Sequence, residues 1–101
     1  MDQSELPQAA VSTTSVPVVT ILYFARLREA LGRESERLEL PAGISSVDSL
    51  REHLRGRGGT WEAELAPAKP VRVAVNQDMA APGLLLADGD EVAFFPPVTG
   101  G

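Results

Sequence analysis

The sequence predicts an α+β fold, a small mixed sheet with one main helix packed on one face. Three patterns carry this prediction. Residues 18–24 have the β-branched and aromatic composition of a strand, residues 46–57 form an amphipathic helix, and residues 70–76 and 91–95 form strands after that helix. This order fits a sheet in which the last strand lies beside the first and runs parallel to it.

The first half of the domain is predicted to be a strand, a short helix and a second strand. Val18–Phe24 has the continuous apolar pattern of a central strand buried on both faces. Ala25–Leu31 places two leucines one turn apart, and Gly32 suits the left-handed position that follows a helix. Ser35–Leu40 alternates polar and apolar residues and ends at a Pro-Ala-Gly turn. We therefore expect two paired strands whose connection contains a turn of helix.

The main helix is predicted from Ser46 to about Arg57. Ser45 and Asp48 have the composition of a capping pair at its start. An apolar stripe follows, formed by Val47, Leu50 and Leu54. The three arginines toward the C-terminal end, Arg51, Arg55 and Arg57, are interpreted as cations that complement the helix dipole. Thr60–Ala66 is expected to form a further short helical turn.

The last part of the chain is predicted to be strands joined by turns. Pro70–Asn76 alternates valines with other residues, which indicates one buried and one more open face. The chain is expected to reverse at Gln77-Asp78 and to turn again at Asp88-Gly89-Asp90, before the last strand, Glu91–Phe95. The complete order of elements is that of the ubiquitin-like β-grasp arrangement, with the last strand in the centre of the sheet and a protruding C-terminal tail.

These patterns divide the chain into three parts. Residues 1–16 are rich in Ser, Thr, Gln and Ala without sustained periodicity, so we expect a disordered leader. Residues 17–95 are expected to form the β-grasp domain, and residues 96–101 an extended tail that ends in Gly-Gly.

Composition and charge exclude several classes of function. The 101 residues include no cysteine, which removes disulfides, thiolate metal sites and nucleophilic thiols and favours a cytoplasmic setting. A net charge of -5 disfavours binding to phosphate backbones, so no nucleic-acid partner is expected. No apolar stretch approaches the roughly 20 residues that span a bilayer, so no membrane partner is expected either. Asp2 and Glu5 occupy positions at which a signal peptide would carry basic residues, so export is not expected.

The tail is the predicted working part. The sequence ends in Gly100-Gly101, and glycine lacks a Cβ atom, so this backbone is thin enough to enter a narrow cleft. Pro96-Pro97 favours an extended conformation that ends a strand while keeping the chain straight. We predict that Gly101 offers its terminal carboxylate as the reacting group. Residues Phe95 to Gly101 are expected to be exposed and mobile, or only partly ordered, in the free protein and ordered inside a partner.

The rest of the sequence shows no catalytic constellation. His53 has no cysteine partner and no second histidine, so it is interpreted as an ordinary part-exposed residue, and no metal site is expected. Tyr23 and Trp61 are interpreted as core or lid residues. A carboxylate is inert toward most nucleophiles, so the terminal glycine becomes useful only after activation, which adenylation would supply. The acyl-adenylate then accepts either sulfur, giving a thiocarboxylate, or an amine, giving an isopeptide.

The tail segment resembles a known family. The run from Asp88 to Gly101, DGDEVAFFPPVTGG, closely resembles the C-terminus of the small, sulfur-carrying subunits of molybdopterin synthases. Leu22-Tyr23-Phe24-Ala25 with Arg28-Glu29, and Ala74-Val75-Asn76-Gln77, add to the similarity, which spans about residues 18–101.

The resemblance implies a β-grasp carrier whose last glycine is adenylated by a ubiquitin-activating-type enzyme that uses ATP. A sulfur donor then converts the glycine to a thiocarboxylate, whose sulfur goes to a cyclic pyranopterin phosphate and ends in the dithiolene of molybdenum cofactor. The resemblance also implies a larger synthase subunit that holds the substrate and the catalytic side chains. Two small subunits would flank a dimer of large ones, as a heterotetramer, and this chain itself would bind no cofactor.

Three alternatives remain open. The first is a carrier for another sulfur acceptor, as in a thiamine-type pathway. The second is a ubiquitin-like modifier that forms isopeptides with lysines, and the third is a plain binding module whose terminus is irrelevant. The stretch from Phe94 to Gly101 contains no Arg or Lys, which disfavours the modifier. The apolar, stiff residues of this stretch suit a preformed hydrophobic channel instead.

Strand alternation also predicts a docking face. The face that the helix covers is expected to carry Val71, Val73, Val75, Val92 and Phe94. Phe95 then points to the opposite face, which the polarity of Thr20 marks on the first strand and which Leu22 and Phe24 share. The predicted partner contacts are Phe24, Met79 and Phe95, followed along the tail by Pro96, Pro97, Val98 and Thr99. For Phe24, a position in the core remains the alternative.

Overall fold

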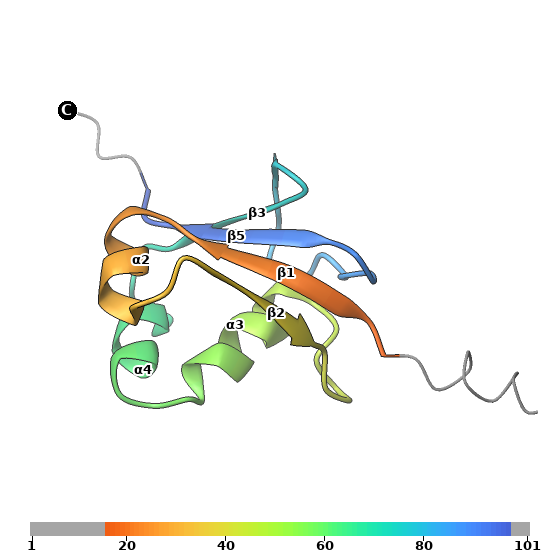
Figure 1. The fold of residues 1–101 in the computed structure, drawn as a ribbon, viewed down its shortest axis with the longest axis horizontal. Helices are drawn as coiled ribbons and strands as arrows, with labels where there is room; N and C mark the ends of the chain where they lie inside the picture. Colours follow the sequence, from red (N-terminus) through yellow and green to blue (C-terminus); the bar gives the residue numbers. More distant parts are fainter. Residues whose placement is uncertain (1–15, 98–101) are drawn as a thin grey trace, which may run out of the picture.

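A computed structural model describes residues 16–97 and shows a mixed five-stranded sheet with three helices (Figure 1). The elements follow one another as β1 (Val18–Tyr23), α2 (Ala25–Leu31), β2 (Ser35–Glu39), α3 (Val47–Arg55), α4 (Thr60–Leu65), β3 (Arg72–Val75), β4 (Asp78–Met79) and β5 (Glu91–Phe95). The predicted α+β class and β-grasp architecture are confirmed. Apart from Val16, the expected leader lies outside the described residues.

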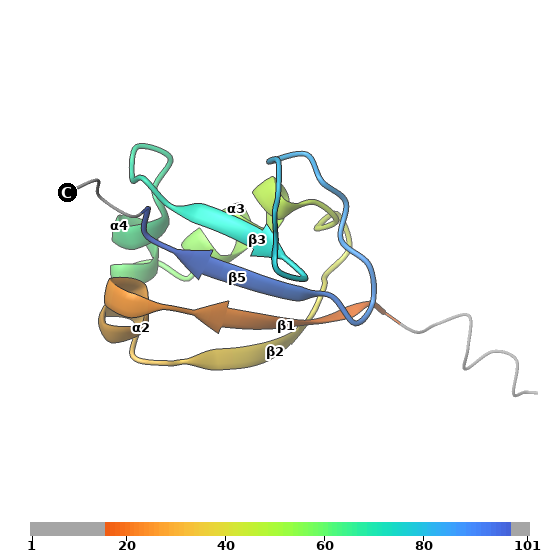
Figure 2. The same cartoon turned by 90° about the horizontal axis from the view of Figure 1, so that it is seen from above.

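Strand β5 occupies the centre of the sheet, whose strand order is β2-β1-β5-β3-β4 (Figure 2). It runs parallel to β1, with Phe94 opposite Tyr23, and antiparallel to β3, with Phe94 opposite Val73. β2 pairs antiparallel with β1, and α2 lies in the connection between these two strands. The predicted central position of the last strand and its parallel pairing with the first are therefore confirmed.

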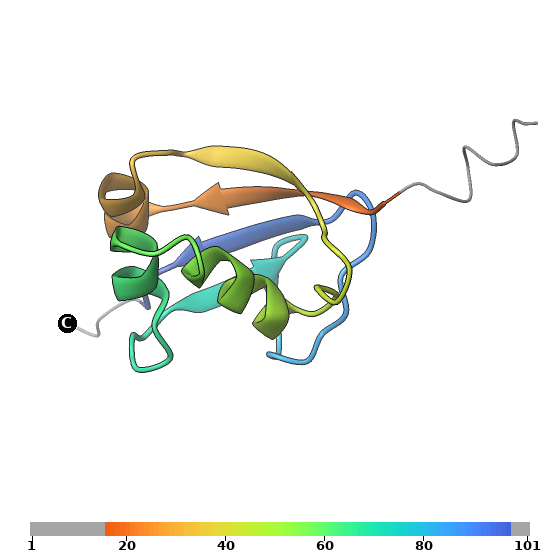
Figure 3. The same cartoon turned by 90° about the horizontal axis from the view of Figure 1, so that it is seen from below.

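The helices leave one face of the sheet open. Helices α3 and α4 lie against one face, and α2 lies at the end of the sheet beside α4 (Figures 1 and 3). The core between the two layers contains Val19, Ile21, Tyr23, Leu27, Leu40, Val47, Leu50, Leu54, Leu65, Val73, Val75, Leu86, Val92 and Phe94. Within the described part of the chain, no helix covers the opposite face, and no helix has the length and apolar character that crossing a membrane requires.

β1 is buried on one face only. Its residues alternate between buried positions, such as Ile21 and Tyr23, and half-buried ones, such as Thr20 and Leu22. The prediction that this strand is buried on both faces is wrong, because no second layer covers the open face. The predicted placement of Thr20 and Leu22 on that face is confirmed by the alternation.

The main helix is shorter than predicted and capped by a different pair. α3 begins at Val47, after Ser46, whose Oγ accepts a hydrogen bond of 3.1 Å from the backbone N–H of Ser49. The Oγ of Ser49 in turn accepts one of 2.9 Å from the backbone N–H of Ser46, which completes a capping box. The predicted pair of Ser45 and Asp48 is therefore shifted by one residue.

Tight turns set the directions of the last strands. Asn76 and Gln77 have φ values of 50° and 73°, as the two central residues of a twisted two-residue hairpin loop require. The reversal thus lies at Asn76-Gln77, one residue before the predicted position, and Asp78 already belongs to β4. Gly32 ends α2 with a φ of 74°, in the left-handed conformation expected from the sequence.

Candidate functional site: the base of the C-terminal tail

The chain is held on both sides up to the last residue of β5. Phe94 is fully buried, and its carbonyl oxygen accepts a hydrogen bond of 3.1 Å from the backbone N–H of Phe24. The Phe94 ring stacks on that of Tyr23, with 6.1 Å between the ring centroids. Phe95 is half-buried and pairs with Arg72 of β3. The prediction of an exposed, mobile segment is therefore wrong for Phe95, because this residue still belongs to the sheet.

The two prolines continue the strand over a shallow groove. Pro96 and Pro97 are half-buried and line this groove together with Leu27, Pro70 and Val71. The chain therefore leaves the sheet at a fixed place and reaches Pro97 in contact with the domain. The predicted tail residues Val98, Thr99, Gly100 and Gly101 lie outside the described residues.

An apolar row crosses the open face of the sheet beside the base of the tail. Leu22, Ala93, Ala74 and Met79 are neighbours on successive strands, β1, β5, β3 and β4. Ala74 is only 8% exposed although no helix of the described chain covers it. The middle of this row is formed by two small side chains, Ala93 of β5 and Ala74 of β3, so it projects less than Leu22 and Met79 at its ends.

The three predicted partner contacts border or belong to this row. Phe24 follows β1 in an extended conformation and is 45% exposed, so the alternative of a core position is wrong. Met79 is 59% exposed, as its lack of a core role predicts. We call Leu22, Phe24, Ala74, Met79, Ala93 and Phe95 the docking patch. Sequence reasoning missed Ala74 and Ala93, since alternation assigns them to a face but only the strand register places them between Leu22 and Met79.

A partly buried ion pair ties the edge of the sheet to the segment before α4. The Tyr23 hydroxyl donates a hydrogen bond of 2.7 Å to Glu36, and the Arg57 guanidinium donates to both Glu36 oxygens at 2.9 Å. The Arg57 guanidinium also lies 4.4 Å from the centroid of the Trp61 ring, which meets the Tyr23 ring edge-on. The stacking of Tyr23 on Phe94 connects this cluster to the base of the tail.

Two opposing effects set the ionisation of this cluster. Burial, followed by the hydrogen bond to Glu36, raises the pKa of the Tyr23 hydroxyl far above its ordinary value. Burial alone would raise the pKa of the Glu36 carboxyl as well. Hydrogen bonds from Arg57 and Tyr23 outweigh that effect and hold the Glu36 pKa below its ordinary value. Glu36 is therefore a carboxylate in the folded protein at neutral pH.

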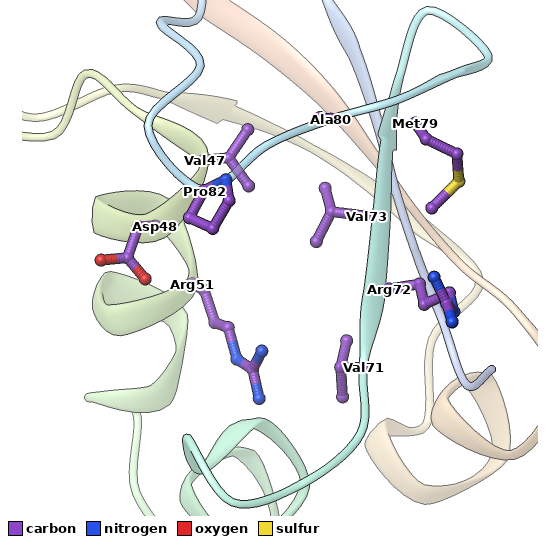
Figure 4. A pocket seen from close by; sticks show the side chains of 9 residues that line it. All are labelled: Val47, Asp48, Arg51, Val71, Arg72, Val73, Met79, Ala80 and Pro82. Carbon is purple, nitrogen blue, oxygen red and sulfur yellow. The ribbon is translucent and has the colours of Figure 1, made fainter.

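Arg51 fixes the segment that leads into β3. Its guanidinium donates hydrogen bonds of 2.9, 2.6 and 3.1 Å to the backbone carbonyls of Leu65, Ala66 and Lys69. Figure 4 shows this side chain reaching from α3 into a groove that faces Val71 and Val73 of the β3 side. The interpretation of Arg51 as a simple partner of the helix dipole is therefore wrong, because its charge satisfies carbonyl groups at the end of α4.

The described residues also form a groove between α3 and β3. Residues 16–97 contain no cluster of three His, Asp or Glu side chains that could hold a metal ion. The groove of about 200 Å³ between α3 and β3 is lined by Asp48 and Arg51 as its charged groups on the helix, and Arg51 is engaged with backbone carbonyls (Figure 4).

The fold and the anchored strand end define a ubiquitin-like β-grasp protein. The family model for the ThiS family matches residues 21–101, and the chain belongs to this family. The molybdopterin synthase sulfur carrier subunit of Escherichia coli is 40% identical over 84 residues, which are 83% of this chain and 100% of that protein.

Solved structures agree with this assignment. A putative molybdopterin converting factor subunit 1 from Pyrococcus furiosus superposes with a TM-score of 0.69 and 33% identity, over 81% of this chain and 99% of that one. Small archaeal modifier protein 1 from Haloferax volcanii gives a TM-score of 0.67 and 29% identity, over 81% and 99% of the two chains. A chain from a complex of subunits 1 and 2 of molybdopterin-converting factor from Helicobacter pylori shares the fold, with a TM-score of 0.58 at 20% identity and coverage of 83% and 99%.

The Glu36 cluster makes the stability of the fold depend on pH. Because the Glu36 pKa is lower in the folded than in the unfolded chain, its contribution is complete above the unfolded value of about 4.3 and is lost as the pH falls through the folded value. We expect Glu36→Gln to lower the free energy of unfolding at pH 7 by about 1–3 kcal/mol, and to lose less stability than the wild type below pH 4.

Chemical denaturation between pH 7 and pH 2 measures both effects. Glu39→Gln is the matched control, since it removes an exposed carboxyl from the same strand, one that forms no ion pair with residues 16–97. Parallel pH profiles for the wild type and Glu36→Gln would contradict the pKa assignment.

Proposed function

We propose that this chain is the sulfur carrier subunit of a molybdopterin synthase. The observation that carries the proposal is the family match, which runs through the last residue, Gly101, and joins a glycine terminus to a strand end that the sheet holds rigidly. The Escherichia coli relative matches over its full length and is named as such a carrier. We also propose a cytoplasmic location, because a chain without cysteine suits a compartment in which disulfides are rare.

The proposed chemistry takes place on the terminal carboxylate. A carboxylate oxygen of Gly101 attacks the α-phosphorus of ATP on a ubiquitin-activating-type enzyme, and pyrophosphate leaves. Sulfide-level sulfur from a donor then attacks the acyl carbon, AMP leaves, and a thiocarboxylate remains. The thiocarboxylate sulfur bonds to a cyclic pyranopterin phosphate, and water then cleaves the resulting thioester, which leaves the sulfur on the pterin and returns the Gly101 carbon to a carboxylate. This chain contributes an unhindered carbonyl group, because glycine places no side chain beside the reacting carbon. In this proposal the chain binds no cofactor of its own.

The proposed partner is the large subunit of the synthase. It would hold the substrate and the catalytic side chains, with two copies of this chain flanking a dimer of large subunits. The docking patch fits such a partner, because Phe24 and Met79 leave large apolar side chains exposed next to the base of the tail. In the Helicobacter pylori structure, subunits 1 and 2 of molybdopterin-converting factor form a protein–protein complex, which supports a partner of this kind.

A protein modifier is the second candidate function. The 29% identity to small archaeal modifier protein 1 favours this candidate. In a modifier, the activated terminus would react with an amine instead of sulfur. A carrier for a thiamine-type pathway uses the same thiocarboxylate with another acceptor. The absence of Arg and Lys from Phe94 to Gly101 continues to favour the molybdopterin synthase function, because an apolar tail suits a preformed channel.

Sulfur transfer should depend on the position of the last residue. One residue added after Gly101 is expected to abolish product formation in a reaction with the large subunit, the activating enzyme, ATP and a sulfur donor, because the activated carboxylate moves away from the reacting position. Gly100→Ala should slow the reaction by at least about tenfold if a Cβ widens the tail inside a tight channel.

The matched control is one residue added before Met1, which should leave both product formation and thermal unfolding unchanged. An extended C-terminus that supports full product formation without being trimmed would refute the proposed role of Gly101.

The docking patch should dominate affinity for the large subunit. Phe95→Asp places a charge in the apolar surface next to the base of the tail and is expected to weaken association by at least about a hundredfold, a loss typical of aromatic anchor residues. Isothermal titration calorimetry measures the effect, and unchanged thermal unfolding shows that the domain stays folded. Glu39→Gln, at the outer edge of β2, serves as the neutral control. Wild-type affinity for Phe95→Asp would place the docking surface elsewhere.

A further inference from the structure

A hollow made of two adjoining grooves lies beside Pro97, the last described residue of the tail. One part, of about 270 Å³, is lined by Leu27, Pro70, Val71, Pro96 and Pro97, among others. A second part, of about 240 Å³, shares Pro70, Val71 and Pro97 and extends to Arg72. The floor of the first part is mainly apolar, and Pro97, where the described chain ends, borders both parts.

Three cations stand around this floor, and two of them keep their charge available. Arg26 is neutralised by Glu64, whose carboxylate oxygens accept hydrogen bonds of 3.0 and 3.1 Å from its guanidinium. Lys69 and Arg72 form no ion pair with any carboxylate of residues 16–97. Lys69 lies in the segment that leads into β3 and lines the first part of the hollow, while Arg72, the first residue of β3, lines the second.

The fold fixes where these two charges stand. The backbone carbonyl of Lys69 accepts a hydrogen bond of 3.1 Å from Arg51, and its backbone N–H donates one of 2.9 Å to Ala66. Arg72 is set by strand pairing opposite Phe95, so it borders the docking patch as well as the tail. Both cations thus come from backbone that the sheet and Arg51 hold in place.

The charge of the sheet is also divided between its two ends. The end opposite the tail carries a group of acids, Asp78, Asp88, Asp90 and Glu91. A chain with a net charge of -5 therefore presents a local positive point where its tail leaves the domain. Such a separation of charge orients two proteins before they touch.

We propose that Lys69 and Arg72 form a second docking element, which pairs with acidic side chains on the rim of the cleft that receives the tail in the large subunit. The inference rests on the proposed function and adds to it a charge-selective contact beside the apolar one. The docking patch supplies the affinity, and the two cations set the orientation in which the tail meets its cleft.

Charge reversal tests the proposal. Arg72→Glu and Lys69→Glu should each weaken association with the large subunit by on the order of tenfold, because an attractive rim contact becomes repulsive. Arg37→Glu is the matched control, since Arg37 is an exposed arginine at the outer edge of the same face, opposite Thr20 and away from the tail. It makes the same change in net charge and should alter the dissociation constant by no more than about twofold.

Calorimetry at low and at high salt completes the test, with Phe95→Asp measured in parallel. The proposal requires that added salt weakens the wild type more than it weakens the Lys69→Glu, Arg72→Glu double variant. Equal affinities for Arg72→Glu, Lys69→Glu and Arg37→Glu would overturn this inference. If Phe95→Asp loses affinity in that case, the proposed partner stands and only the second docking element fails. If Phe95→Asp also binds like the wild type, the proposed docking surface fails with it.

Discussion

The structure depends on one strand pairing, the insertion of β5 between β1 and β3. The last strand of the chain would be free to fray at an edge of the sheet, but in the centre it is hydrogen-bonded on both sides. Phe94 locks it further, because this fully buried ring packs against Tyr23 in the core. The chain can therefore present its C-terminus from a fixed point, and the remaining elements serve to build and bury that point.

The same pairing creates the open face. Placing the helices on one side buries Val73, Val92 and Phe94, and alternation then sends Ala74, Ala93 and Phe95 to the other side. No second layer formed by residues 16–97 covers these residues, so an apolar surface remains beside the base of the tail. We propose that a partner that receives the tail contacts this surface at the same time, so that recognition of the domain also positions the reacting group.

Patterns local in sequence predicted much of this fold. The apolar stripe of α3 and the alternation of β3 have clear periods, and the order of elements implies the β-grasp topology. Errors arose where the answer depends on distant parts of the chain. Ser45, Ser46 and Ser49 near the start of α3 allow several capping arrangements. Which serine caps the helix depends on where the helix begins in the folded chain, and there the cap is Ser46. Phe24 is exposed because the second face has no cover, which a strand's own composition does not reveal. The roles of Arg51, Lys69 and Arg72 depend on the strand register and on the segment that precedes β3.

We propose that the terminal carboxylate of Gly101 is converted to a thiocarboxylate, while the folded domain binds the partner proteins. Intact-mass spectrometry of the full chain tests it most directly, after incubation with ATP, a sulfur donor and a candidate activating enzyme. The account predicts the exchange of one oxygen for one sulfur atom, located in the C-terminal peptide. A terminus that keeps both oxygen atoms under conditions in which the enzyme sulfurates a known carrier, or one that becomes joined to lysine side chains instead, would contradict the account.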